Sequence, residues 1–137
     1  MAELSLNHGL YNGEWQKQPI LIGVSGGILA RISLSPTIAG TNAVDGGIVP
    51  AGEIWEIHSL TLLSEVAIGT GLRAILVRGA NTVRVFVADA PTIAYTYTKT
   101  TRFVMFSGDL LRLVSIGDPG GASIFLDYIG IRCDIDQ

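Results

Sequence analysis

Residues that commonly carry out chemistry are few in this sequence and lie far apart. The chain has two histidines, His8 and His58, and no Gly-x-Ser-x-Gly elbow that would present a nucleophilic serine. A metal site needs several ligands in one place, and the nearest carboxylate on the strand face of His58 is Glu56, two positions earlier. Glu56 and His58 stay open as a two-ligand fragment. We expect His58 to be a polar side chain on an outward face, and the sequence predicts no catalytic centre.

One glycine motif has the spacing of a dinucleotide-binding loop. Residues 69–74 follow the pattern G-x-G-x-x-A, and Asp89 comes twenty positions after Gly69. Such a loop works only where a helix starts directly behind it, because the free N–H groups of that helix receive the pyrophosphate. Residues 72–78 are too few and too β-branched to form this helix before the break at 79–81. We therefore expect an ordinary turn and no cofactor.

The remaining ligand types give no site either. Cys133 is the only cysteine, so an intrachain disulfide and a cysteine-based zinc site are both excluded within one chain. We expect it to be a small buried side chain on a terminal strand. Asp134 and Asp136 lack the glycine and glutamate spacing of a dedicated calcium loop, which predicts a solvated chain end.

Composition excludes two further classes of function. Hydrophobic residues make up 48% of the chain and charged residues 15%, but the most apolar stretch, residues 19–34, is interrupted by glycines and by Arg31. A membrane-spanning helix needs about 20 consecutive apolar residues, so none is expected. The net charge is −3 and the basic residues are scattered, which argues against nucleic acid as a partner. The first residues lack the pattern of a secretory signal, which predicts synthesis in a cytoplasm.

The elements that must position these residues are strands. From residue 49 onward, short apolar runs end at Gly, Pro, Asn, Asp or Ser, a pattern typical of a β-sandwich or barrel. Residues 79–81 predict a hairpin turn. The apolar parity changes near His58, which predicts a β-bulge there. In the run after the hairpin, we expect Val83, Val85 and Val87 to share one face. The strands predicted after residue 49 are 53–66, 72–78, 82–88, 94–106, 109–116 and 122–133.

The part before residue 49 is less regular. Strands are expected at 19–24 and 28–34, and the small polar residues of 35–47 predict a loop. Residues 1–18 show no clear period and are expected to form an extended N-terminal arm. The predicted fold is therefore all-β: a single-domain β-sandwich or jelly roll of about eight antiparallel strands, formed by residues 19–137.

The shortage of charge points to assembly. Soluble monomers keep their exposed apolar patches small, whereas permanent interfaces are depleted of charged residues. The segments 20–48 and 116–131 have this composition. We expect a homo-oligomer, with a trimer ahead of a dimer.

Three segments carry a resemblance to a known group of proteins. Residues 49–57 (VPAGEIWEI), 107–112 (SGDLLR) and 127–129 (DYI) resemble strands of the small β-sandwich virion proteins of tailed bacteriophages. Pro50 and Gly52 suit a turn before a strand, and Gly108 with Asp109 suits another. The resemblance implies an accessory structural protein of a phage particle, most specifically a capsid decoration or cement protein located on the virion. The partners it implies are copies of the chain and the major capsid protein or another virion protein.

The same resemblance implies a role for the arm, since some proteins of this group reach neighbouring capsid subunits with an N-terminal segment. The apolar residues that would anchor it are Leu4, Leu6, Leu10, Tyr11 and Trp15.

Two alternative functions stay open. One is a receptor-binding or carbohydrate-binding module of a phage fibre or tail tip, because exposed aromatic rings can stack on sugars, although large aromatics at strand spacing more often fill a core or an interface. The other is an enzyme on a barrel scaffold, which would need bound metal or several ionisable groups in one pocket. The aromatic residues relevant to the first alternative are Tyr11, Trp15, Trp55, Tyr95 and Tyr97.

Overall fold

The computed structural model describes residues 20–65, 71–89, 91, 96–121 and 123–136, and these residues form strands and turns without a helix. The all-β prediction is confirmed, and so is the number of strands. The eight strands are β1 (Ile20–Leu34), β2 (Gly40–Asp45), β3 (Glu53–Ser64), β4 (Gly71–Arg78), β5 (Asn81–Asp89), β6 (Thr96–Met105), β7 (Leu110–Asp118) and β8 (Ile124–Asp136).

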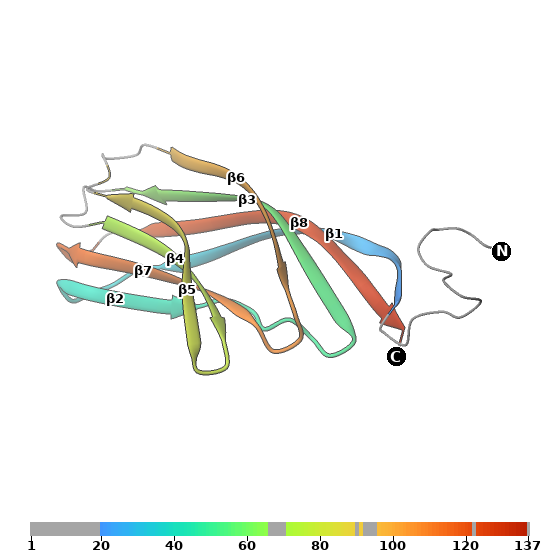
Figure 1. Cartoon of the computed structure of the whole chain (residues 1–137). Helices are drawn as coiled ribbons and strands as arrows, with labels where there is room; N and C mark the ends of the chain where they lie inside the picture. Colours follow the sequence, from blue (N-terminus) through green and yellow to red (C-terminus); the bar gives the residue numbers. More distant parts are fainter. Residues whose placement is uncertain (1–19, 66–70, 90, 92–95, 122, 137) are drawn as a thin grey trace, which may run out of the picture.

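The strands form two antiparallel four-stranded sheets. Sheet 1 has the order β1-β8-β3-β6 and sheet 2 the order β2-β7-β4-β5 (Figure 1). The pairs β1 with β8, β2 with β7, β3 with β6 and β4 with β5 are those of one long hairpin folded back at the β4–β5 turn. Rolling that hairpin up adds the pairs β3 with β8 and β4 with β7. This is the topology of a jelly roll.

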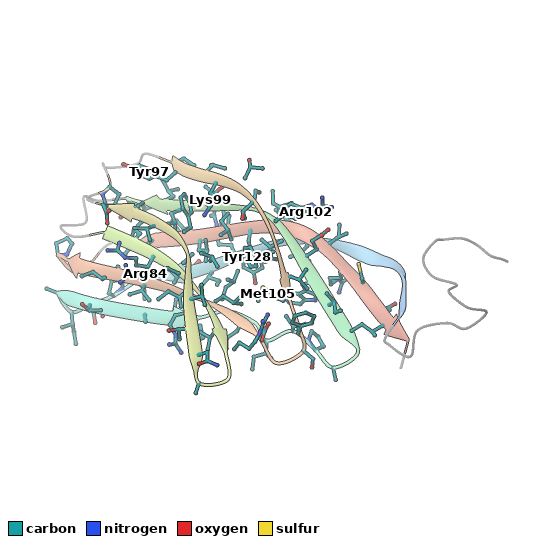
Figure 2. The ribbon with its side chains drawn as sticks, viewed as in Figure 1. Arg84, Tyr97, Lys99, Arg102, Met105 and Tyr128 are labelled. Carbon is teal, nitrogen blue, oxygen red and sulfur yellow. The ribbon has the colours of Figure 1, made fainter. Side chains whose placement is uncertain are left out.

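The core lies between the inner faces of the two sheets. Buried and more exposed side chains alternate along β2 and most of β1 and β8, as the two-residue period of a strand requires. Tyr128 and Met105 lie in this layer (Figure 2), and burial raises the pKa of the Tyr128 hydroxyl. Fully buried large side chains come from both sheets: Ile57, Leu60, Leu62, Leu72, Met105, Leu111, Leu113, Ile124 and Leu126.

The N-terminal half differs from the prediction in two places. The two strands expected at 19–24 and 28–34 are one strand, β1, and its two register shifts against β8 end at Gly23 and Gly26. A bulge absorbs extra residues without ending a strand, which is why the glycines do not break the chain here. The expected loop at 35–47 contains β2, whose pairing with β7 stabilises a segment of weak strand propensity. The predicted arm, residues 1–18, lies outside the described residues.

Two local predictions after residue 49 are confirmed. The hairpin between β4 and β5 turns at Gly79 and Ala80, and Gly79 has a φ of +59°, which glycine adopts without strain. The bulge near His58 is a register shift between Ile57 and Ser59 against both neighbouring strands.

Gly130 makes the His58 bulge possible. A Cβ atom at this position would lie 2.1 Å from the backbone oxygen of Glu56, so only glycine fits opposite the bulge. The geometry of β3 at Glu56 and His58 therefore depends on the absence of a side chain on β8.

The shared face expected for the valines of β5 is wrong. A register shift between Ala74 and Ile75 against β5 leaves Val85 without a directly opposite partner, so the parity changes at this residue. Val83 lies directly opposite Leu76 and Val87 directly opposite Arg73, and both valines are exposed. Val85, in contrast, packs against the core.

Candidate functional site

The outer face of sheet 1 carries a row of polar side chains that crosses all four strands. Arg31, Asp127, Thr61 and Thr98 are directly opposite one another from β1 to β6. Arg31 donates to both oxygens of Asp127, at 2.6 and 2.8 Å, and the two threonine hydroxyls are 3.2 Å apart. The Arg31 guanidinium also lies over the ring of Phe125, 4.4 Å from its centre. The charges of this row are paired with each other, which leaves no free acid or base in it.

A second polar group on this face surrounds the β3 bulge. The Nε2 atom of His58 is 2.9 Å from Oε1 of Glu56, and Arg102 donates from Nε to Oε2 of Glu56 at 3.0 Å. Figure 2 shows Arg102 on β6, beside the part of β3 that carries the other two residues. The hydrogen bond with His58, followed by that from Arg102, lowers the pKa of the Glu56 carboxyl. Glu56 is therefore held as a paired carboxylate and is a poor proton acceptor.

The surroundings of Glu56 and His58 show whether this pair could serve as two ligands of a metal ion. The expected outward position of His58 is confirmed, since it lies half-exposed on sheet 1 beside Glu56. The third partner is a cation, Arg102, which repels metal ions. Across the described parts of the chain, no three or more His, Cys, Asp or Glu side chains gather in a group that could hold a metal.

Large apolar side chains are also exposed on this outer face. Leu29 on β1 is 84% exposed and lies directly opposite Ile129 on β8, which is 50% exposed. Val104 on β6 is 37% exposed and lies directly opposite Glu56 on the same face. The outer face of sheet 1 thus presents apolar side chains on its edge strand β1 and on β8. The nearby charges, Arg31 with Asp127 and Arg102 with Glu56, are paired with each other. Surface of this kind suits contact with another protein.

Two of the motifs that resemble virion proteins meet at one corner of the sandwich. Val49 donates its N–H to the backbone oxygen of Asp109 at 2.9 Å, and Gly108 donates to the oxygen of Val49 at 2.9 Å. The turn expected at Pro50 is present, closed by a 3.3 Å hydrogen bond from the Glu53 N–H. The second expected turn is present at Gly108, whose φ is +90°.

The side chain of Asp109 ties this corner to the β4–β5 hairpin. It is 3% exposed and accepts hydrogen bonds from Arg78 Nε at 2.9 Å, from Arg78 Nη2 at 2.7 Å and from the Phe106 N–H at 2.8 Å. Burial raises the pKa of the Asp109 carboxyl, but the bonds from Arg78 and Phe106 outweigh burial and leave it below its ordinary value. We call Arg78, Phe106 and Asp109 the Asp109 corner. It has a structural role.

The glycine motif, the cysteine and the aromatic residues considered in the sequence analysis form no site in the described residues. Gly71 to Ala74 of the glycine motif form the start of β4 and not a helix, and residues 69 and 70 lie outside the described residues. Cys133 is buried on β8 as predicted. The described aromatics, Trp55 and Tyr97, pack against the core, while Tyr11, Trp15 and Tyr95 lie outside the described residues. The arm anchors Leu4, Leu6 and Leu10 lie outside them too.

Sequence reasoning did not single out Leu29 and Ile129. Both alternate with buried neighbours, which gives their outward direction, but nothing local distinguishes a covered outer face from an open one. A search for apolar residues at outward parity on predicted strands would have found them.

No protein-family model and no curated protein matches the chain. Among solved structures, one described as "CBM4 structure and function" aligns over 77% of this chain and 82% of its own, with 12% identity and a TM-score of 0.38. Dimeric latent PorU from Porphyromonas gingivalis aligns over 84% of this chain with 14% identity and a TM-score of 0.33, and the matched part is 14% of PorU. Similarity at this level carries no information on function. No helix in the described residues has the length and apolar character to cross a membrane.

Proposed function

We propose that this chain is a non-enzymatic structural protein that acts by docking onto copies of itself and onto a larger protein shell. The specific form of the proposal is a decoration or cement protein of a phage capsid. The observation that carries it is the outer face of sheet 1, where Leu29 and Ile129 are exposed side by side among charges that are paired with one another.

The distribution of charge favours docking over catalysis. A reacting group needs an unpaired acid, base or nucleophile, whereas Glu56, Asp127 and Asp109 each bind an arginine. An interface gains from the same arrangement, because charges that are already neutralised cost less to remove from water.

The fold and the motifs add support of a different kind. Jelly rolls occur in viral capsid proteins, although they also occur in lectins and other proteins, so topology alone does not decide the function. The motif residues around Val49 and Asp109 shape a corner of the sandwich. This is consistent with a resemblance in fold and says nothing about a partner.

The carbohydrate-binding alternative has less support. It requires aromatic rings that are free to stack on a sugar, and both Trp55 and Tyr97 pack against the core. Phe106 is 47% exposed, but the Arg78 guanidinium already lies 4.9 Å from its ring centre. Specific binding of the purified chain on a glycan array would reverse this preference.

The experiment that tests the capsid role uses particles that lack the chain. The full chain is added to them and sedimented with them, beside a truncated chain comprising residues 19–137. We expect the full chain to bind and the truncated chain to lose binding while keeping its thermal unfolding transition. A second variant, with serine at each of Leu4, Leu6, Leu10, Tyr11 and Trp15, separates the loss of anchors from the loss of length. Binding of the truncated chain at full strength would remove the arm from the mechanism, and no binding of the full chain would reject the capsid role.

A further inference from the structure

β1 is an edge strand of unusual length and low charge. It comprises 15 residues at the border of sheet 1, and within the described residues it pairs only with β8 (Figure 1). A strand in this position presents backbone N–H and C=O groups on its open side, which another strand can pair with. Its only charged residue is Arg31, and the guanidinium is bound to Asp127.

The other three edge strands have features that discourage pairing. β2 has only six residues, with Asp45 at its end. β5 carries Arg84 and Asp89. β6 carries Arg102 and Lys99, whose ammonium group bonds the backbone oxygen of Val85 at 3.0 Å (Figure 2). Short length and charged side chains are the usual means by which proteins block an edge. β1 is long, and its one charged side chain, Arg31, is already paired with Asp127, so these features indicate an edge that another strand can cover.

We propose that β1 pairs antiparallel with β1 of a second copy of this chain, about a two-fold axis at Leu29. The inference rests on the proposed function, because it names the surface through which the copies associate. The paired strands join the two copies of sheet 1 into one continuous eight-stranded sheet. The contact makes a dimer, the second of the two oligomers expected from the sequence.

The side chains of β1 are compatible with those of a second β1 strand, which favours a second copy of this chain as the partner. With Leu29 on the axis, the leucines of the two copies face each other, and each Arg31 faces Gly27 of the other strand, which has no side chain to displace it. An axis at Arg31 would instead place two arginines opposite each other, which is unfavourable. Leu29 is 84% exposed in one copy, and at the axis its side chain would contact the same side chain of the other copy.

The regular part of β1 is long enough for this pairing. The register shifts against β8 lie between Leu21 and Gly23 and between Val24 and Gly26, so the strand is regular from Gly26 to Leu34. Pairing about Leu29 matches Gly26 with Ile32 of the other copy, within the regular part on both strands. The side chains alternate there as pairing requires, with Ile28 and Ile32 buried and Leu29 and Arg31 outward.

The first test is the mass of the full chain by sedimentation equilibrium, for the wild type and for Leu29→Asp. The control is Val83→Asp, because Val83, like Leu29, is an apolar side chain exposed on an edge strand. Val83 is 57% exposed on β5. We expect a wild-type dimer, a rise of at least ~30-fold in its dissociation constant for Leu29→Asp, and little change for Val83→Asp. Thermal unfolding confirms that both variants fold, as replacement of exposed side chains allows.

A cross-link tests the register. In a Cys133→Ser background, Leu29→Cys places two thiols across the axis at a separation that a disulfide can span, and Val83→Cys is the control. We expect oxidation to give a covalent dimer for Leu29→Cys alone.

The possible failures are distinguishable. A wild-type monomer would overturn both this pairing and self-association in the proposed function. A stable trimer, a dimer insensitive to Leu29→Asp, equal loss in the Val83→Asp control, or equal cross-linking at both positions would overturn the pairing and leave the proposed function standing.

Discussion

Replacing Asp109 with alanine should lower the free energy of unfolding by about 3 kcal/mol. The carboxylate is 3% exposed and binds two nitrogens of Arg78 and the N–H of Phe106, so its removal leaves the amide and the guanidinium without their acceptor. Breaking a buried ion pair costs about 3 to 5 kcal/mol, and the low end applies because Arg78 is 50% exposed and can turn to water. For a chain of this length the loss corresponds to a fall of roughly 10 °C in melting temperature.

Two variants calibrate this value. Asp109→Asn keeps an oxygen for the Phe106 N–H but loses the charge, so about half of the effect should remain. Asp45→Ala removes a similar fork to Arg112, with Oδ1 2.5 Å from Nε, but the two side chains are 44% and 35% exposed. Exposed pairs contribute about 0 to 1 kcal/mol. Urea unfolding at pH 7 gives all three values, and an Asp109→Ala cost no larger than that of Asp45→Ala would refute the reasoning.

The pH dependence gives an independent check on the same corner. The folded chain holds the pKa of Asp109 below its value in the unfolded chain, about 3.9. The carboxylate therefore stabilises the fold fully above that unfolded value, and the contribution is lost as pH falls through the lower folded value. The difference between wild type and Asp109→Asn should shrink from pH 7 to pH 3. A difference that is unchanged at pH 3 would mean that charge is not its source.

Two further treatments test the β3 bulge and the response of the fold to metal chelation. Gly130→Ala should destabilise the fold by about 3 kcal/mol, because its Cβ would lie 2.1 Å from the Glu56 oxygen, whereas Gly47→Ala, with open space around it, should change stability by less than about 1 kcal/mol. Equal effects in urea unfolding would show that β8 does not approach β3 this closely. Treatment with EDTA should leave the melting temperature unchanged, since in the described residues no three or more His, Cys, Asp or Glu side chains gather to hold a metal. A clear fall in melting temperature on chelation would contradict this.

Much of the fold could be predicted because the signals that specify it are local. The apolar parity around His58 marks the bulge, and the Gly79 turn marks the hairpin, since each depends on residues close in sequence. β2 was missed because its residues have weak strand propensity and it forms by pairing with β7, far away in the chain. Glycines in β1 suggested a break because sequence alone does not tell a bulge from a turn.

The candidate site was harder to predict for the same physical reason. Glu56 and His58 are two residues apart, and their proximity was foreseen, but Arg102 joins them through the β3–β6 pairing. The partner of Asp109, Arg78, is likewise distant in sequence. The exposure of Leu29 depends on β1 being the edge of a sheet, which is a property of the whole topology. Only the strand order reveals it.

The central claim is that this jelly roll acts by associating through its exposed sheet surface. The most direct test is the mass of the full chain in solution at micromolar concentration, measured by sedimentation equilibrium. The claim predicts a stable homo-oligomer, and the β1 pairing predicts a dimer that Leu29→Asp dissociates. A single species with the mass of one chain, 14.5 kDa, would contradict it.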